Sequence, residues 1–229
     1  MIDQLWCLHD AEPRDGPLNM AFDELMLEVS GERAVAVLRT YRWSEPFVSM
    51  GYFDRLGIVR EQFPGRPIVR RWTGGGVVDH RADFTFSLSV PAEHPLARQP
   101  ATARYRAVHA GVARALEHLG IRSQSAGRPA ADVAGTPPAP CFDAAVCGDL
   151  LSDGRKIVGG AQRRTRAGVL HQGSIQAPEL ALDWPTLGRS LATALAREIF
   201  VLDLDRALGE RANALAHGKY ATSTWLEAR

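Results

Sequence analysis

The sequence has 229 residues, 45% of them apolar and 23% charged, so it is long enough and ordinary enough in composition to fold around a buried core. The formal net charge of +1 gives no overall electrostatic reason to expect a nucleic-acid or membrane partner. No stretch approaches the roughly 18 uncharged apolar residues of a membrane span, and the N-terminal MIDQLWC lacks the basic and apolar regions of a signal peptide.

The first 90 residues predict one helix and four strands. Apolar residues recur at helical spacing over 18–29, which predicts a helix with one buried face. Strands are predicted over 34–41 and 47–52, joined by a Ser-Glu-Pro turn, and over 68–72. Residues 84–90 alternate apolar and polar side chains, which is typical of a strand with one buried face.

The rest of the sequence predicts a helix over 102–119 and then a long loop over 125–140, rich in Ala, Gly and Pro. The further predicted elements are short strands at about 148–152, 155–163 and 167–176 and helices over 184–199 and at about 205–216. Because the strands come in runs instead of alternating with helices, we expect an α+β fold. No linker divides the chain, so residues 1–229 are expected to form one domain.

Three cysteines, Cys7, Cys141 and Cys147, are too few to indicate a disulfide framework. A reducing compartment fits this usage, so a cytoplasmic location is expected. Cys141 and Cys147 have no second Cys or His pair at zinc-ligand spacing, so no metal site is expected. Cys141 follows a Pro-rich segment, which is an unusual place for a core cysteine and fits a thiolate nucleophile, with His80 and His171 as candidate bases.

Lysine is rare in this sequence. Of the 27 basic residues only Lys156 and Lys219 are lysines, so a cation that arginine could replace would normally be arginine here. A lysine is a compact point charge that can polarise a carbonyl, hold a phosphate or move a proton. Lys156 precedes Gly159 and Gly160, which indicates close backbone approach nearby. We therefore expect Lys156 to belong to a functional site.

The glycine run 74–76 is open to two interpretations. It lacks the spacing of a dinucleotide-binding loop, and a turn or bulge between strands would explain it. Its neighbours Arg70, Arg71 and His80 favour a second interpretation, in which free backbone N–H groups bind a phosphate or carbonyl oxygen.

Five segments occur in a fixed order over most of residues 14–176. They are residues 16–24 (GPLNMAFDE), 38–46 (LRTYRWSEP) together with 49–53 (SMGYF), 70–80 (RRWTGGGVVDH), 156–164 (KIVGGAQRR) and 170–174 (LHQGS). Each is weak alone, but together they resemble the lipoate–protein ligase and octanoyltransferase family, which shares its catalytic fold with biotin protein ligase. The resemblance implies a central mixed or antiparallel sheet flanked by helices.

The resemblance also implies roles for residues. Lys156 would contact the acyl carbonyl or an acyl-adenylate, and Cys141, in a CFD segment like that of one octanoyltransferase class, would be the nucleophile. The residues implied to bind substrate are Arg70, Gly74, Gly75, Gly76, His80, Asp149, Gly159, Gly160, Ala161, His171 and Gly173. The saturated chain would lie in an apolar tunnel, where about 0.8 kcal/mol per buried CH₂ is enough to select chain length.

Two reactions remain open for such a protein. An octanoyltransferase would move octanoate from an acyl carrier protein through an acyl-cysteine to a lysine of a lipoyl domain or glycine-cleavage H protein, with no cofactor. A lipoate–protein ligase, or the catalytic subunit of a split ligase, would use ATP and Mg²⁺ instead and act through lipoyl-AMP. Residues 148–150 (GDL) resemble the ligases' NDL segment. A binder of lipoyl domains without turnover is a third alternative. We expect the transferase, acting as a monomer, without nucleic acid or membrane.

Overall fold

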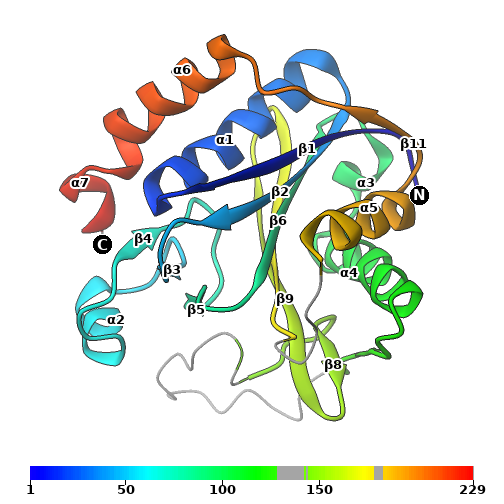
Figure 1. Cartoon of the computed structure of the whole chain (residues 1–229), viewed down its shortest axis with the longest axis horizontal. Coiled ribbons are helices and arrows are strands. Elements are labelled where there is room, and N and C mark those ends of the chain that lie inside the picture. Colours follow the sequence, from blue (N-terminus) through cyan, green and yellow to red (C-terminus); the bar gives the residue numbers. More distant parts are fainter. Residues whose placement is uncertain (128–141, 143, 178–182, 229) are drawn as a thin grey trace.

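The computed structural model describes residues 1–127, 142, 144–177 and 183–228 (Figure 1). Within them the main sheet has eight strands in the order β11-β1-β2-β6-β10-β9-β8-β7. The strands are β1 (Ile2–Arg14), β2 (Ala36–Trp43), β6 (Phe84–Pro91), β7 (Gln124–Ser125), β8 (Leu150–Ser152), β9 (Arg155–Arg164), β10 (Gly168–Ile175) and β11 (Ala196–Val201). The pairs β11–β1 and β1–β2 are parallel and the others are antiparallel, so the sheet is mixed.

A smaller sheet lies beside the end of the main one, with the order β4-β3-β5. Its strands are β3 (Val48–Met50), β4 (Ile68–Arg70) and β5 (Val78–Asp79), and α2 (Leu56–Gln62) connects β3 to β4. The predicted glycine run follows β4 and precedes β5, so this small sheet carries it.

Helices cover both faces of the main sheet (Figure 1). One face packs on α1 (Gly16–Arg33) and α6 (Arg206–Leu215) through a core that includes Phe22, Met26 and Val37. The other packs on α4 (Ala101–His118) and α5 (Trp184–Leu195) through a larger core that includes Leu38 and Phe86. The remaining helical segments are α3 (Pro95–Arg98), a π-helical turn η1 (Ala216–Tyr220) and α7 (Ser223–Leu226). The predicted α+β class is confirmed.

The local sequence explains where α1 begins and ends. Asp15 caps its N-terminus by accepting a hydrogen bond from the Leu18 amide at 2.8 Å, and Pro17 occupies the first turn. Ala34 ends it in the left-handed region, with φ of 54°. The helix therefore presents a fixed face to the sheet.

Two predictions are wrong, one about which strands are neighbours and one about how deeply a strand is buried. The strands predicted over 34–41 and 47–52 exist as β2 and β3, but they belong to different sheets and form no hairpin with each other. The strand predicted over 84–90 is buried on both faces, because α1 covers its polar face and the Ser87 hydroxyl donates to Asp23 at 2.7 Å.

The two parallel strands at the sheet edge were not predicted. Burial along β1 follows no simple alternation, so its sequence lacks a strand signature. The helix predicted over 184–199 ends at Leu195, and residues 196–201 form β11, whose Ala196 pairs with Ile2. Residues 128–140 of the predicted loop lie outside the described residues.

Candidate functional site

The glycine run is held in place by Arg71. Its guanidinium donates to the carbonyls of Gly74 at 3.0 Å and Gly76 at 2.8 Å, and its other branch donates to the Ser49 carbonyl and hydroxyl, both at 2.8 Å. Gly75 has φ of 83°, a conformation that favours glycine. The loop is thus held in a fixed shape, with Gly75 exposed at its tip.

The Arg70 side chain is taken up by backbone carbonyls of neighbouring segments. It is buried and donates to the carbonyls of Tyr52 and Asp54, each at 2.9 Å, and to that of Leu226 at 2.9 Å. The Trp225 indole donates back to the Arg70 carbonyl at 3.0 Å. Arg70 therefore ties the glycine loop to α2 and to the C-terminal α7.

A narrow pocket, here called the central pocket, lies between α1, the small sheet, and strands β2, β6, β9 and β10. Its lining residues are Met20, Tyr41, Trp43, Ser49, Arg71, Gly75, Val78, His80, Thr85, Gly159, Gly160, Ala161, Gln172, Gly173 and Ser174. The free volume is about 30 Å³, room for one or two waters, so an acyl chain enters only if side chains move apart. The pocket is lined mainly by apolar groups.

Six of the predicted substrate-binding residues line this pocket: Gly75, His80, Gly159, Gly160, Ala161 and Gly173. Five others do not line it: Arg70, Gly74, Gly76, Asp149 and His171. Lys156, the predicted catalytic lysine, also stands outside its lining. Glycine is needed at position 173, because a Cβ there would lie 2.3 Å from the Phe86 ring.

His80 is part of a buried chain of hydrogen bonds in the wall of the central pocket. Its Nε2 bonds the Ser49 hydroxyl at 2.7 Å, and its Nδ1 bonds Asp83 Oδ2 at 2.7 Å. The ring stacks on Trp43 with centroids 4.0 Å apart. Because Ser49 also accepts from Arg71, the imidazole is linked to the glycine loop.

A second polar network joins α1 to the central pocket. Asp23, fully buried, accepts hydrogen bonds from Arg39 at 2.9 Å, Tyr41 at 2.9 Å and Gln172 at 2.6 Å. Burial and the neighbouring Asp23 carboxylate raise the pKa of Tyr41 well above its usual value, so this hydroxyl remains a donor. Asp23 and Gln172 fall in the segments 16–24 and 170–174, and the resemblance implies a place for Gln172 in the pocket wall, but no role was predicted for Asp23.

Lys156 forms a buried ion pair with Asp149. The Nζ–Oδ2 distance is 2.7 Å, and the two side chains are 3% and 0% exposed. The same carboxylate oxygen accepts the Val146 amide at 2.7 Å. The ammonium also lies 5.2 Å from the centre of the Phe142 ring. Lys156 is therefore a fixed, buried cation and not a surface charge.

Cys141 and Asp143 lie outside the described residues. Their described neighbours in the sequence, Phe142 and Ala144, both contact Lys156: Phe142 through its ring and Ala144 through its carbonyl, which accepts from Nζ at 3.4 Å. Cys147 carries a free thiol.

His171 points to the α4 side of the sheet, away from the central pocket. Its Nδ1 lies 3.1 Å from the Gln162 amide, and its Nε2 has no hydrogen-bond partner in the described part of the chain. Burial holds the pKa of His171 well below its usual range and lowers that of the neighbouring His109 to about 4. Both rings are therefore neutral at pH 7, and His171 is a poor proton acceptor there.

Tyr105, also on α4, connects this side to the lysine site. Its hydroxyl donates to Asp149 Oδ1 and accepts the Gly160 amide at 2.9 Å. A Cβ on Gly160 would lie 2.6 Å from His171 Nε2, so only glycine fits beside the histidine. No local pattern pointed to Tyr105 or His109, because only the fold brings α4 against β9.

Among the described residues, no group of three or more His, Cys, Asp or Glu side chains is arranged to hold a metal ion. None of the helices that the structure describes is long and apolar enough to cross a membrane.

Comparison with known proteins explains the order of the five sequence segments. Residues 15–178 match the lipoyl protein ligase A/B catalytic domain. This chain belongs to that family. It is 32% identical over 183 residues to octanoyltransferase LipM of Macrococcus caseolyticus and 34% identical over 190 residues to that of Staphylococcus aureus, covering 76% of this chain and 66% of the relative in each case. The chain thus spans just under two thirds of the length of these curated relatives.

Solved structures of lipoyl protein ligase A/B type share the fold. Protein Ta0514 of T. acidophilum, solved with bound lipoic acid, superposes with a TM-score of 0.76 at 19% identity, covering 99% of this chain and 100% of that one. Lipoate-protein ligase A bound with ATP superposes with a TM-score of 0.75 at 19% identity, covering 99% of both chains. At such low identity the likeness establishes the fold alone.

Proposed function

We propose that this protein is an octanoyltransferase that moves an octanoyl group from an acyl carrier protein to a lysine of a lipoyl domain or glycine-cleavage H protein, through an acyl-cysteine at Cys141. The observation that carries the proposal is the buried Lys156–Asp149 pair beside Phe142, the residue that follows Cys141 in the sequence. The octanoyltransferase names of the relatives support it.

The first step exchanges one thioester for another. The Cys141 thiolate attacks the carbonyl carbon of the octanoyl thioester, the bond to the carrier's sulfur breaks, and the carrier leaves as a thiol after gaining a proton. Negative charge develops on the carbonyl oxygen, and the Lys156 ammonium with nearby backbone N–H groups stabilises it. Because Asp149 fixes the ammonium in position, little reorganisation accompanies this step.

The second step forms the amide. The amine of the acceptor lysine attacks the carbonyl carbon of the acyl-cysteine, loses a proton, and displaces the Cys141 thiolate. Neither step consumes ATP or requires a metal ion. The central pocket would hold the octanoyl chain after its side chains separate, at a gain of about 0.8 kcal/mol per buried CH₂.

Mass spectrometry after incubation with the octanoyl carrier protein tests this proposal. We expect a single octanoyl adduct on Cys141, no adduct in Cys141→Ala, and loss of transfer in that variant. Cys147→Ala, which removes the nearby free thiol, is the matched control and should keep both the adduct and transfer. Full transfer by Cys141→Ala would overturn the acyl-cysteine mechanism.

An ATP-dependent lipoate–protein ligase is the second candidate, because a ligase with bound ATP shares the fold and Asp149 stands in a GDL segment. In that reaction free lipoate would acylate a lysine of the lipoyl domain only with ATP and Mg²⁺, and Cys141→Ala would have no effect. A non-catalytic binder would retain a lipoyl domain in a pull-down without either reaction.

A further inference from the structure

A second pocket lies directly beside the central pocket. It has a volume of about 370 Å³ and shares Trp43 and His80 with the central pocket. Arg42 and Arg81 are among its lining residues, so we call it the arginine pocket. Ile175 in its wall is the register partner of Val158, two positions beyond Lys156 on β9. The arginine pocket is therefore adjacent to the central pocket and close to the strand that carries the lysine.

Two cations stand at this pocket. Arg42 is exposed, and its guanidinium packs 4.9 Å from the Trp184 ring and makes no hydrogen bond to a described residue. Arg81 has a side chain 70% exposed and is paired with Asp79, which Arg66 also binds. Asp183 lies close enough to Arg42 for the arginine to lower the pKa of that carboxyl, after the larger effect of its hydrogen bond from Thr186.

Among the described residues, the rim holds more guanidinium groups than carboxylates. Asp79 is shared by Arg66 and Arg81, and the exposed Asp183 lies near both Arg42 and Arg189, so two carboxylates face four guanidinium groups. The third carboxylate, Asp83, lies buried in the wall beside His80. Guanidinium groups bind phosphate oxygens through charge-assisted hydrogen bonds. The rim therefore suits a phosphate group.

The pocket also contains a buried acceptor without a partner. Asp83 lines it with a side chain only 1% exposed. Its Oδ2 accepts from His80, Thr85 and Ser174, but its Oδ1 has no hydrogen bond within the described residues. A buried carboxylate oxygen is normally satisfied, so this one fits an N–H or O–H donor of a ligand.

The remaining walls are apolar. Phe84 and Trp184 face each other with centroids 4.5 Å apart, and Ile175 stands beside them in the lining. Aliphatic segments of a ligand would pack on these side chains.

We propose that the arginine pocket binds the phosphopantetheine arm of the acyl donor. Its phosphate would lie at Arg42 and Arg81, an amide or hydroxyl at Asp83, and its thioester end at the Trp43–His80 boundary with the central pocket. This assignment rests on the proposed transfer from a thioester, and it names the part of the donor that the enzyme recognises.

Comparison of phosphorylated and unphosphorylated donors tests the proposal. KM and kcat are measured for octanoyl-phosphopantetheine and octanoyl-pantetheine with the natural sequence and with an Arg42→Gln/Arg81→Gln double variant. We expect KM for the phosphorylated donor to rise about tenfold in the variant, with the unphosphorylated donor unaffected and kcat unchanged. The proposal would be overturned if the double variant raised KM equally for both donors, or if the natural enzyme had the same KM for both.

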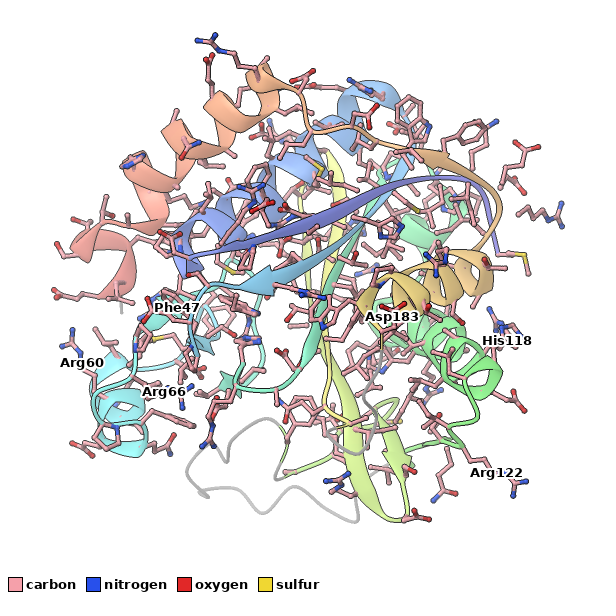
Figure 2. The ribbon with its side chains drawn as sticks, in the orientation of Figure 1. Phe47, Arg60, Arg66, His118, Arg122 and Asp183 are labelled. Atoms are coloured by element: carbon pink, nitrogen blue, oxygen red, sulfur yellow. The ribbon has the colours of Figure 1, made fainter. Side chains whose placement is uncertain are left out.

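A charge-matched control uses Arg60 and Arg122. Figure 2 shows these residues on opposite sides of the molecule, both pointing outwards. Arg60→Gln/Arg122→Gln removes the same charge far from the pocket and should leave both KM values unchanged. A tenfold rise in this control as well would show a general charge effect and contradict the proposal.

Two further experiments distinguish the possible donors from each other and distinguish this pocket from the proposed function. Octanoyl-coenzyme A and octanoyl-carrier protein both carry the phosphopantetheine arm, so the double variant should raise KM by a similar factor for both donors. A rise in KM for the carrier protein alone would mean that the arginines contact the carrier's protein surface instead, and would contradict the proposal. Calorimetry with phosphopantetheine alone needs no turnover. If no octanoyl thioester reacts, the proposed function is wrong. Binding of phosphopantetheine that is tenfold weaker in the double variant would still support the arginine pocket in that case. Binding that is absent, or equal in the two proteins, would refute the arginine pocket.

Discussion

The Asp23 carboxylate and the Gln172 side-chain amide meet at 2.6 Å beside the central pocket. Asp23 belongs to α1 and Gln172 to β10, and the oxygen of the same amide accepts the Thr73 hydroxyl at 2.6 Å. Thr73 directly precedes the glycine run. A buried acid of the first helix thus fixes the start of the loop that exposes its backbone to the pocket.

Asp23→Asn should reduce the free energy of unfolding by about 3 kcal/mol, because it removes a buried charge that pairs with Arg39, a guanidinium that is itself fully buried. Urea unfolding measures the loss. The control is Asp205→Asn at the N-cap of α6, where asparagine caps about as well and stability should change little. A loss under 1 kcal/mol for Asp23→Asn would show that Asp10, the other partner of Arg39, compensates for it.

Gly160→Ala should lower acyl transfer more than tenfold and cost about 1–3 kcal/mol of stability, since the new methyl would lie 2.6 Å from His171 Nε2 and 3.1 Å from the Gln172 carbonyl. Transfer rates and urea unfolding report both effects. Gly57→Ala in α2 meets nothing within 4 Å and should stabilise the protein by about 0.5–1 kcal/mol. Equal behaviour of the two variants would contradict the close packing behind β9.

Lys156→Arg should abolish most acyl transfer while the protein remains folded. The guanidinium can still pair with Asp149, but its planar, larger group cannot occupy the buried position of a compact ammonium. We expect a fall of about 100-fold or more in the rate of acyl-enzyme formation, measured in a single turnover. Lys219→Arg, at the other lysine of the chain, should leave that rate unchanged. An equal fall in the rate for both variants would contradict a specific role for Lys156.

Stability should fall as the pH drops from about 6.5 to 4. Burial lowers the pKa of His109 to about 4 in the folded protein, while the unfolded imidazole keeps its usual value near 6.5. Between these values the unfolded chain binds more protons, so the contribution is complete above pH 6.5 and is lost on acidification, by roughly 3 kcal/mol. Urea unfolding at several pH values checks this, and His109→Gln should make the profile shallower, while His171, whose pKa burial also lowers, keeps part of the dependence. An equally steep profile in the variant would assign the dependence to other groups.

Local patterns predicted the elements that carry the site. The repeat of apolar and polar residues along a short segment is enough to predict a helix or a strand. It predicted the helix over 18–29, the strand β6 and the strands around Lys156. The rarity of lysine also directed attention to Lys156, and the structure places that residue in a buried ion pair. Such features need no knowledge of distant contacts.

Distant contacts decided what could not be predicted. β1 and β11 form a parallel pair although they lie near opposite ends of the sequence, and β1 has no alternating pattern that would predict a strand. Arg70 was expected to bind substrate, but its side chain bonds carbonyls from two distant segments, the β3–α2 connection and α7. Tyr105 and His109 reach the lysine site only because α4 packs behind β9.

The bond between Arg70 and the Leu226 carbonyl also sets an order of events during synthesis. The two residues lie 156 positions apart, so at ribosomal speed roughly ten to thirty seconds separate their appearance. Until α7 emerges, the segment that contains the glycine run lacks one of its anchors. A nascent or prematurely ended polypeptide can therefore build most of the sheet before the glycine loop reaches its final shape.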